Sequence, residues 1–221
     1  MNNIFGIYKP QGPSSFAIIY QLRKIFNIKK IGHAGTLDPL ADGVLVVAVG
    51  RDATKQLTGL IQKEKEYLAT IKLGFTSTTD DGEGTITSQA VAQQPTIEQV
   101  NQTLKEFIGE IAQVPPIFSA LKINGKPAYK YARAGKELKM EARKVVINEV
   151  ELVKYSWPEL VVRVDCGSGV YIRSLARDIG AKLGVGAYMS GLTRTRVGEF
   201  TLDKCVTIEE LTNNKEKYDI R

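Results

Sequence analysis

The sequence predicts an α+β domain built on a mixed, largely antiparallel sheet with flanking helices. Segments typical of strands follow one another through short turns, and helices separate only some of them, unlike the regular strand–helix alternation of a doubly wound parallel sheet. The chain has 221 residues, of which 43% are hydrophobic, enough to bury the core of one domain, with or without a small appendage. Its glycine and proline contents are ordinary, which argues against disorder.

The first half of the chain alternates short apolar segments with amphipathic ones. The expected strands cover residues 3–8, 44–49 and 65–73, the last at an exposed edge of the sheet. The expected helices cover residues 14–27, capped by Ser14, and residues 52–61. Residues 76–84 carry three acids but lack the ligand spacing of a calcium loop, so we expect a solvated turn there.

The second half contains two capping boxes, which mark helix starts. Thr96 and Gln99 open a helix that Gly109 is expected to stop, and Thr207 opens a short helix near the end. The other expected helices cover residues 127–134 and 171–184. Val114-Pro115-Pro116 is expected to end a short strand, and further strands are expected over residues 119–123, 145–157 and 160–166. A tight turn is expected at Asn124-Gly125.

The basic charge of the chain is concentrated in one segment. The formal net charge is +6, and the predicted isoelectric point is about 9.2. Residues 122–144 hold eight Lys or Arg residues against Glu137 and Glu141, an excess equal to the whole net charge. Tyr129 and Tyr131 lie among these cations, a combination that offers phosphate contacts and flat faces to unpaired RNA bases. Composition alone leaves a merely solvated charged face equally open.

The sequence does not support a membrane-spanning, secreted, zinc-binding or nucleotide-binding protein. No apolar run has the length of a membrane span and residues 1–10 lack a signal-peptide pattern, so we expect a cytoplasmic protein with Cys166 and Cys205 reduced. One histidine and two distant cysteines do not supply a usual zinc ligand set, although an oxygen-only magnesium site stays open. No complete nucleotide-binding glycine motif is present. A monomer is the simplest expectation for a domain with its own cleft.

Residues 31–43 hold the single histidine, His33, and two acids, Asp38 and Asp42, directly before the apolar run. Three glycines and a proline predict a loop over the whole stretch. A carboxylate on such a loop can act as a nucleophile, a general base or a metal ligand. Asp38 before Pro39 equally fits a turn, Asp42 fits a turn better than a catalytic role, and His33 by itself fits a histidine bonded to the backbone.

Other candidate residues also have structural explanations. Tyr67 fits an aromatic side chain half-buried on a sheet. Tyr171 and Arg173 stand at a helix start, where Arg173 can pair with a buried carboxylate, bind a phosphate or face solvent.

Four segments resemble the TruB family of tRNA pseudouridine synthases. Residues 33–43, His-Ala-Gly-Thr-Leu-Asp-Pro-Leu-Ala-Asp-Gly, closely resemble its catalytic loop, although Asp42 stands where the family often has threonine. Residues 113–133 resemble its RNA-gripping insertion. Residues 171–180 and 192–198 are similar as well. Val170, directly before the first of these segments, and Thr193, in the second, are conservative departures from the family.

The resemblance implies the pseudouridine synthase fold and the isomerisation of uridine at position 55, in the T loop of tRNA, by base flipping and without a cofactor or metal. It implies that Asp38 and Arg173 are catalytic, with Arg173 pairing with the Asp38 carboxylate. The residues implied in substrate binding are His33, Tyr67, Tyr171 and Leu192, and those implied in the RNA-binding patch are Lys122, Lys126, Tyr129, Lys130 and Arg133. The expected partner is the T arm of tRNA.

The expected domain organisation is one catalytic domain over residues 1–221, with the RNA-gripping insertion at about residues 113–144 and no C-terminal PUA-type RNA-binding domain. Whether Asp38 attacks the sugar C1′, attacks the base C6 or removes a sugar proton stays open, as do the role of Asp42 and the range of RNA substrates. A protein that binds or folds tRNA without chemistry is the alternative function. An aspartate-dependent hydrolase is a third one, and it would release a base or a phosphate.

Overall fold

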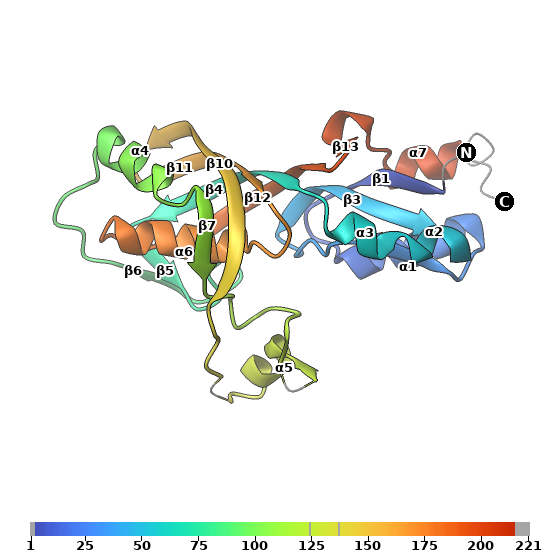
Figure 1. Cartoon of the computed structure of the whole chain (residues 1–221), viewed down its shortest axis with the longest axis horizontal. Helices are drawn as coiled ribbons and strands as arrows, with labels where there is room; N and C mark the ends of the chain where they lie inside the picture. The colour runs from blue at the N-terminus through green and yellow to red at the C-terminus, as the bar shows by residue number, and fades with distance from the viewer. Residues whose placement is uncertain (1–2, 124, 137, 215–221) are drawn as a thin grey trace. The chain divides into compact units, whose positions relative to one another are not determined.

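The computed structural model describes residues 3–123, 125–136 and 138–214. The chain forms two compact units (Figure 1). Unit 1 consists of residues Met1–Leu68 and Leu192–Arg221, and unit 2 consists of residues Ala69–Gly191. The chain passes from one unit to the other within strands β4 (Lys65–Leu73) and β12 (Ala187–Val197).

Unit 1 is built around β3 (Ala41–Val49), in which residues 44–49 are fully buried. β1 (Ile4–Lys9) pairs antiparallel with one edge of β3. On the other edge, the start of β3 pairs parallel with β12, and its end pairs antiparallel with β2 (Ile31–Ala34). The short β13 (Phe200–Thr201) folds back on β12. The strand predicted from the apolar run is therefore confirmed as the centre of this sheet.

Two helices of unit 1, α1 (Ser15–Phe26) and α7 (Ile208–Asn213), begin at their predicted caps. α1 packs Ile18, Ile19 and Leu22 into the core, and the Ser14 side chain accepts a hydrogen bond from the Ala17 amide. The capping box at Thr207 opens α7.

The single helix predicted over residues 52–61 is wrong. α2 (Arg51–Lys55) is followed by a separate α3 (Leu57–Ile61). The Gln56 amide donates a hydrogen bond to the Ala53 carbonyl, three residues back, which tightens the turn between the two helices.

The prediction of a loop over the whole of residues 31–43 is also wrong, because β2 takes up the start of this stretch and β3 the end. Its glycines allow close packing of backbone instead of preventing strands. A Cβ atom on Gly32 would lie 2.6 Å from the Leu57 side chain, and one on Gly43, whose φ is +106°, would lie 2.2 Å from the Arg194 carbonyl oxygen. Only residues 35–40, which include Asp38, form the loop.

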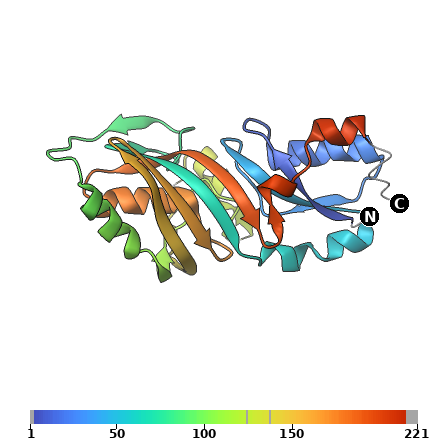
Figure 2. The same cartoon turned by 90° about the horizontal axis from the view of Figure 1, so that it is seen from above.

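The strands of unit 2 lie side by side in a twisted sheet (Figure 2) in the order β12-β4-β11-β10-β7. β11 (Glu159–Cys166), β10 (Arg143–Ser156) and β7 (Gly109–Gln113) pair antiparallel. β4 lies between two other strands, so the prediction of an exposed edge strand is wrong. A separate two-stranded ladder is formed by β5 (Phe75–Ser77) and β6 (Ile86–Ser88).

Two helices of unit 2, α4 (Ile97–Lys105) and α6 (Ile172–Lys182), pack against each other. α6 buries Leu175, Ala176 and Ile179 completely, as their helical spacing predicted. α4 also contacts β10, and it starts at the predicted capping box. It ends before Gly109, which opens β7 with a φ of +102° instead of stopping the helix, so that prediction is corrected.

The insertion contains a small hairpin of β8 (Lys122–Ile123) and β9 (Lys126–Pro127), followed by α5 (Ala128–Arg133). Figure 1 shows α5 set apart from the strands of unit 2. Asn124, part of the predicted turn, and Glu137 lie outside the described residues.

The architecture confirms the α+β prediction, with a mixed and mostly antiparallel sheet and packed helices. Neither Cys166 nor Cys205 forms a disulfide, and burial raises the pKa of the Cys205 thiol to about 11. Within the part of the chain that the structure describes, no helix combines the length and the apolar character needed to cross a bilayer.

Candidate active site

The loop that carries Asp38 is fixed through the backbone of the residues on either side. Ser15, at the first turn of α1, is 1% exposed. Its hydroxyl accepts a hydrogen bond from the Leu37 amide and donates one to the Leu37 carbonyl, both at 2.9 Å. The Gly12 amide donates to the Pro39 carbonyl at 2.8 Å. The positions directly before and after Asp38 are therefore held by different elements of unit 1.

Two buried cations hold the ends of the same loop. The Lys9 ammonium donates to the carbonyls of Ala41 at 2.6 Å and Pro10 at 2.9 Å. The Arg194 guanidinium donates to the carbonyls of Val44 at 2.8 Å and Gly35 at 3.0 Å. Burial lowers the pKa of Lys9, although the charges of Asp42 and Asp38 act to raise it. Neither Lys9 nor Arg194 was among the predicted site residues, because no local pattern shows that a strand cation bonds to a distant loop.

His33 lies on β2, opposite Val47 of β3. Burial, followed by the positive charge of Arg194, lowers the pKa of this histidine below 6.5, and a hydrogen bond to the Gly35 backbone only partly opposes the shift. The imidazole is therefore neutral at pH 7.

The remaining predicted residues of unit 1 lie on strands. Tyr67, on β4, is 7% exposed and so is buried more deeply than a half-buried sheet residue. Leu192, on β12, is the register partner of Ala41 at the start of β3. Asp42 pairs with Thr193 in the same register, and both its charge and a hydrogen bond to it add to burial in raising the pKa of Tyr8. Asp42 is thus a half-buried strand residue and not the turn residue expected.

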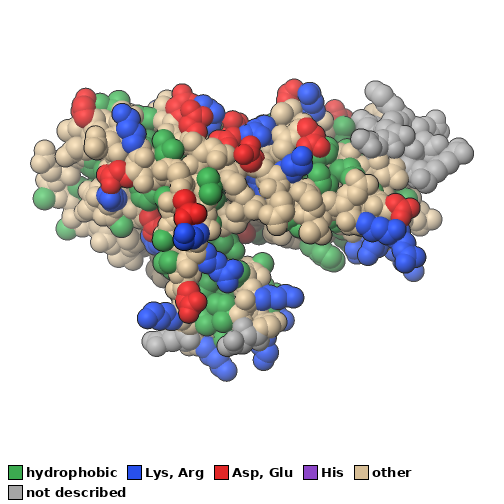
Figure 3. Space-filling model, viewed as in Figure 1, with side chains coloured by type: hydrophobic (Ala, Val, Ile, Leu, Met, Phe, Trp, Pro, Cys, Tyr) green, Lys and Arg blue, Asp and Glu red, His purple; other side chains and the backbone are tan. Residues whose placement is uncertain are grey.

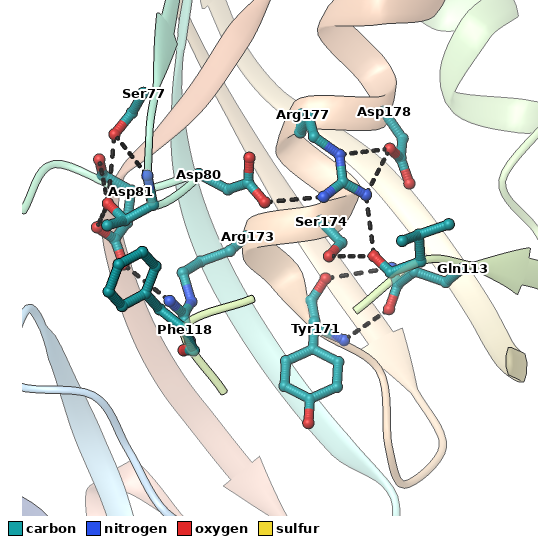
Figure 4. Close-up of polar contacts among 12 residues, drawn as sticks. Ser77, Asp80, Asp81, Gln113, Phe118, Tyr171, Arg173, Ser174, Arg177 and Asp178 are labelled. Carbon is teal, nitrogen blue, oxygen red and sulfur yellow. Dashed lines mark hydrogen bonds and ion pairs between the residues drawn. The ribbon is translucent and has the colours of Figure 1, made fainter. Parts of the chain in front are cut away.

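In unit 2, Tyr171 is the cap residue of α6, and a buried glutamine fixes its backbone. The Gln113 side chain accepts a hydrogen bond from the Tyr171 amide at 2.8 Å and donates one to the Tyr171 carbonyl at 3.2 Å (Figure 4). Gln113 is 1% exposed. The end of β7 therefore sets the start of α6.

Arg173, on the first turn of α6, forms a buried ion pair with Asp81. Its guanidinium donates to the Asp81 carboxylate at 3.2 Å and to the Phe118 carbonyl at 2.9 Å (Figure 4). The Asp81 carboxylate also accepts from the Thr79 hydroxyl at 2.6 Å and the Glu83 amide at 3.0 Å. Asp81 is 2% exposed, so the prediction of a solvated turn is wrong at this residue.

A second ion pair joins Asp80, the residue before Asp81, to Arg177, which lies one turn after Arg173 on α6. Arg177 donates to Asp80 at 2.8 Å, to Asp178 at 2.9 Å and to the Val114 carbonyl at 2.9 Å. Burial raises the pKa values of Asp80 and Asp178, and the Arg177 charge opposes both shifts. Sequence reasoning missed both pairs because about ninety residues separate each acid from its arginine.

The structure brings together the residues of the predicted RNA-binding patch on the hairpin and α5 of the insertion. Lys122, Lys126, Lys130 and Arg133 are exposed. The Arg133 guanidinium lies 5.4 Å from the centre of the Tyr129 ring, a cation–π contact that leaves the charge in solvent. Lys and Arg side chains dominate this segment in Figure 3.

No group of three or more His, Cys, Asp or Glu residues is placed to hold a metal ion within residues 3–123, 125–136 and 138–214.

Comparison with known proteins places these residues in a family. Residues 23–172 match the model for the TruB family pseudouridylate synthase N-terminal domain, and residues 173–220 match that for the tRNA pseudouridylate synthase B C-terminal domain. The tRNA pseudouridine synthase B of Parabacteroides distasonis is 46% identical over 219 residues, covering 96% of this chain and 93% of that protein. The enzyme of the same name from Phocaeicola vulgatus is 42% identical over 218 residues, covering 96% and 92%.

A solved structure shows the same fold. The crystal structure of a Cbf5–Nop10–Gar1 complex matches with a TM-score of 0.76 and 32% identity, over 99% of this chain and 56% of that one. Since the family models together match residues 23–220, the chain belongs to the TruB family of pseudouridylate synthases.

Proposed function

We propose that this chain converts uridine to pseudouridine at position 55, in the T loop of tRNA, and that Asp38 is the carboxylate that acts on the nucleotide. The observation that carries the proposal is the match, over nearly the whole of both chains, to relatives named tRNA pseudouridine synthase B. The chain's own geometry supports it, because a carboxylate sits on a loop whose backbone is fixed on both sides.

The reaction needs no oxidant or reductant. The bond between N1 of the base and C1′ of the sugar breaks, the base rotates, and C5 forms the new bond to C1′. The proton on C5 leaves and N1 gains a proton, so the product is an isomer of the substrate. We therefore propose no nucleotide cofactor and no metal.

The bonds to the backbone on either side of Asp38 position this residue for the proposed reaction. A catalytic group must lie within a fraction of an ångström of its productive position, and the Ser15 and Gly12 bonds to the residues around Asp38 limit its movement. The carboxylate then attacks C1′, attacks C6 or removes a sugar proton.

We propose Arg173 as the second catalytic residue, because a guanidinium can stabilise negative charge on a carboxylate. Asp81 is the positioning residue for this arginine, because it binds the Arg173 guanidinium and is itself held by Thr79 and the Glu83 amide.

The target base must leave the stacked T loop before it can react, at a cost of about a few kcal/mol. We propose that Tyr67 stacks on the extruded base, that Tyr171 and Leu192 line its pocket, and that the neutral imidazole of His33 fills the space the base leaves. The patch of Lys122, Lys126, Tyr129, Lys130 and Arg133 binds the T arm. A monomer suffices for this reaction.

The experiment uses purified protein and an unmodified tRNA transcript, without added metal or nucleotide. Pseudouridine is mapped by carbodiimide treatment and primer extension. We expect one stop in the T loop with the wild type, no stop with Asp38→Ala, and a normal stop with Asp52→Ala, which changes an exposed carboxylate on α2. Tight tRNA binding without any stop would instead support a protein that binds tRNA without chemistry.

A further inference from the structure

The exposed side of α1 combines aromatic rings with cations. Phe16 is 63% exposed and Tyr20 is 54% exposed, which is unusual for large aromatic side chains. With Lys24 they occupy every fourth position of the helix, so the three residues form one stripe along it. The Arg23 guanidinium lies 5.6 Å from the centre of the Phe16 ring, and the Lys24 ammonium lies 4.6 Å from that of Tyr20.

The first 37 residues of the sequence contribute only positive charge to this surface. No acid occurs in the sequence before Asp38, whereas Lys24, Lys29 and Lys30 are exposed on α1 and the turn after it. Figure 3 shows a gathering of Lys and Arg side chains over the part of unit 1 that Figure 1 labels α1 and α2. The surface is therefore complementary to a polyanion, and its open rings suit a base better than an acidic protein.

The position of the stripe connects it to the reaction. Phe16 follows Ser15, whose hydroxyl holds the backbone of Leu37, the residue next to Asp38. The stripe therefore begins beside the residue that holds the Asp38 loop and runs over residues 16–24 of the helix, a rise of about 12 Å.

We propose that the α1 stripe, defined as Phe16, Tyr20, Lys24, Lys29 and Lys30, is a second RNA-binding surface that holds substrate RNA next to the target uridine. The rings stack on an unpaired base, and the lysines contact phosphates. This inference rests on the proposed function for the identity of the RNA. It is separate from the patch on the insertion, which belongs to unit 2.

Two double variants of the stripe test the proposal against matched controls. Lys24→Glu/Lys30→Glu is compared with Lys105→Glu/Lys204→Glu, which makes the same change of charge at exposed lysines elsewhere. Phe16→Ala/Tyr20→Ala is compared with Ile97→Ala/Ile108→Ala, which removes exposed apolar side chains from unit 2. Thermal unfolding checks that all four proteins are folded. Dissociation constants for tRNA are measured at several salt concentrations.

We expect each stripe variant to bind tRNA about tenfold more weakly than its control, and the lysine variant to reduce the salt slope by about 1.4 to 1.8, the value for two lost phosphate contacts. Turnover at saturating tRNA stays at the wild-type value because Asp38 is untouched. Unchanged affinity and slope in both stripe variants would overturn the proposal. Failure of the proposed function is a distinct result, since the wild type would then bind tRNA without forming pseudouridine.

Discussion

The Asp38 loop in unit 1 and the arginine side chains of α6 in unit 2 are held by different kinds of bond. Around Asp38, side chains bond to backbone carbonyls and amides: Ser15 to Leu37, Lys9 to Ala41 and Arg194 to Gly35. At α6, the contacts that position the arginines include ion pairs to the consecutive acids Asp80 and Asp81. The loop is therefore restrained through its backbone atoms, whereas the arginines of α6 are restrained through their own guanidinium groups.

The difference suits the two proposed roles. Bonds to the backbone restrain a loop through the chain itself, so the position of Asp38 does not depend on its carboxylate alone. An arginine that supplies only charge can keep a permanent partner, and the buried Asp81 is such a partner for Arg173.

The largest effect is expected from breaking the buried pair. Asp81→Asn keeps the shape of the side chain but removes the negative charge beside a guanidinium that is only 8% exposed. We expect it to lower the free energy of unfolding by about 3 to 5 kcal/mol. Asp80→Asn breaks a pair whose side chains are 17% and 31% exposed, and it should cost about 1 kcal/mol or less. Urea unfolding measures both, and equal losses would contradict the distinction between the two pairs.

Two adjacent serines offer a matched test of the loop. Ser15→Ala leaves the buried amide and carbonyl of Leu37 without this partner, which should cost about 1 to 3 kcal/mol and lower kcat several-fold, because the Asp38 loop loosens. Ser14→Ala removes the cap of α1 and should cost about 1 kcal/mol with kcat unchanged. Urea unfolding and single-turnover kinetics separate stability from catalysis. A normal kcat in Ser15→Ala would show that the loop does not need this bond.

A smaller effect is expected from the pH dependence of stability. The pKa of His33 in the folded protein lies below the ordinary value of 6.5, so the unfolded chain takes up a proton more readily as the pH falls through 6.5. Acid therefore destabilises the folded state through this group, whose contribution to stability is fully present above pH 6.5 and decreases as the pH falls. His33→Asn should lose less stability than the wild type between pH 7.5 and 5.5 in thermal unfolding. Since the chain has one histidine, a difference of the opposite sign would refute the assignment.

The fold was largely predictable where the signal was local. The apolar run of β3, the cap at Ser14 and the capping boxes at Thr96 and Thr207 each act over a few residues, and all of them are present in the structure. The errors arose where pairing with distant chain decided the result. β2 formed because β3 offers it hydrogen-bond partners, and β4 gained neighbours on both sides from elsewhere in the sequence.

The candidate site shows the same limit. The Asp38 loop was found from its sequence because its residues are contiguous, and Tyr171 and Arg173 were found at a helix start. Asp81 was read as a solvated acid because its partner lies 92 residues away. Lys9 and Arg194 were missed for the same reason, since they act on carbonyls that carry no sequence signal.

The most direct test of the proposed function follows the hydrogen on C5 of uridine. It must leave if C5 forms the new bond to the sugar, so tRNA labelled with tritium at that carbon releases tritium to water in a single turnover. We predict release with the wild type and with Ser14→Ala, and none with Asp38→Asn although that variant still binds tRNA. Release at the wild-type rate by a folded Asp38→Asn protein would contradict the assignment of Asp38 as the acting carboxylate.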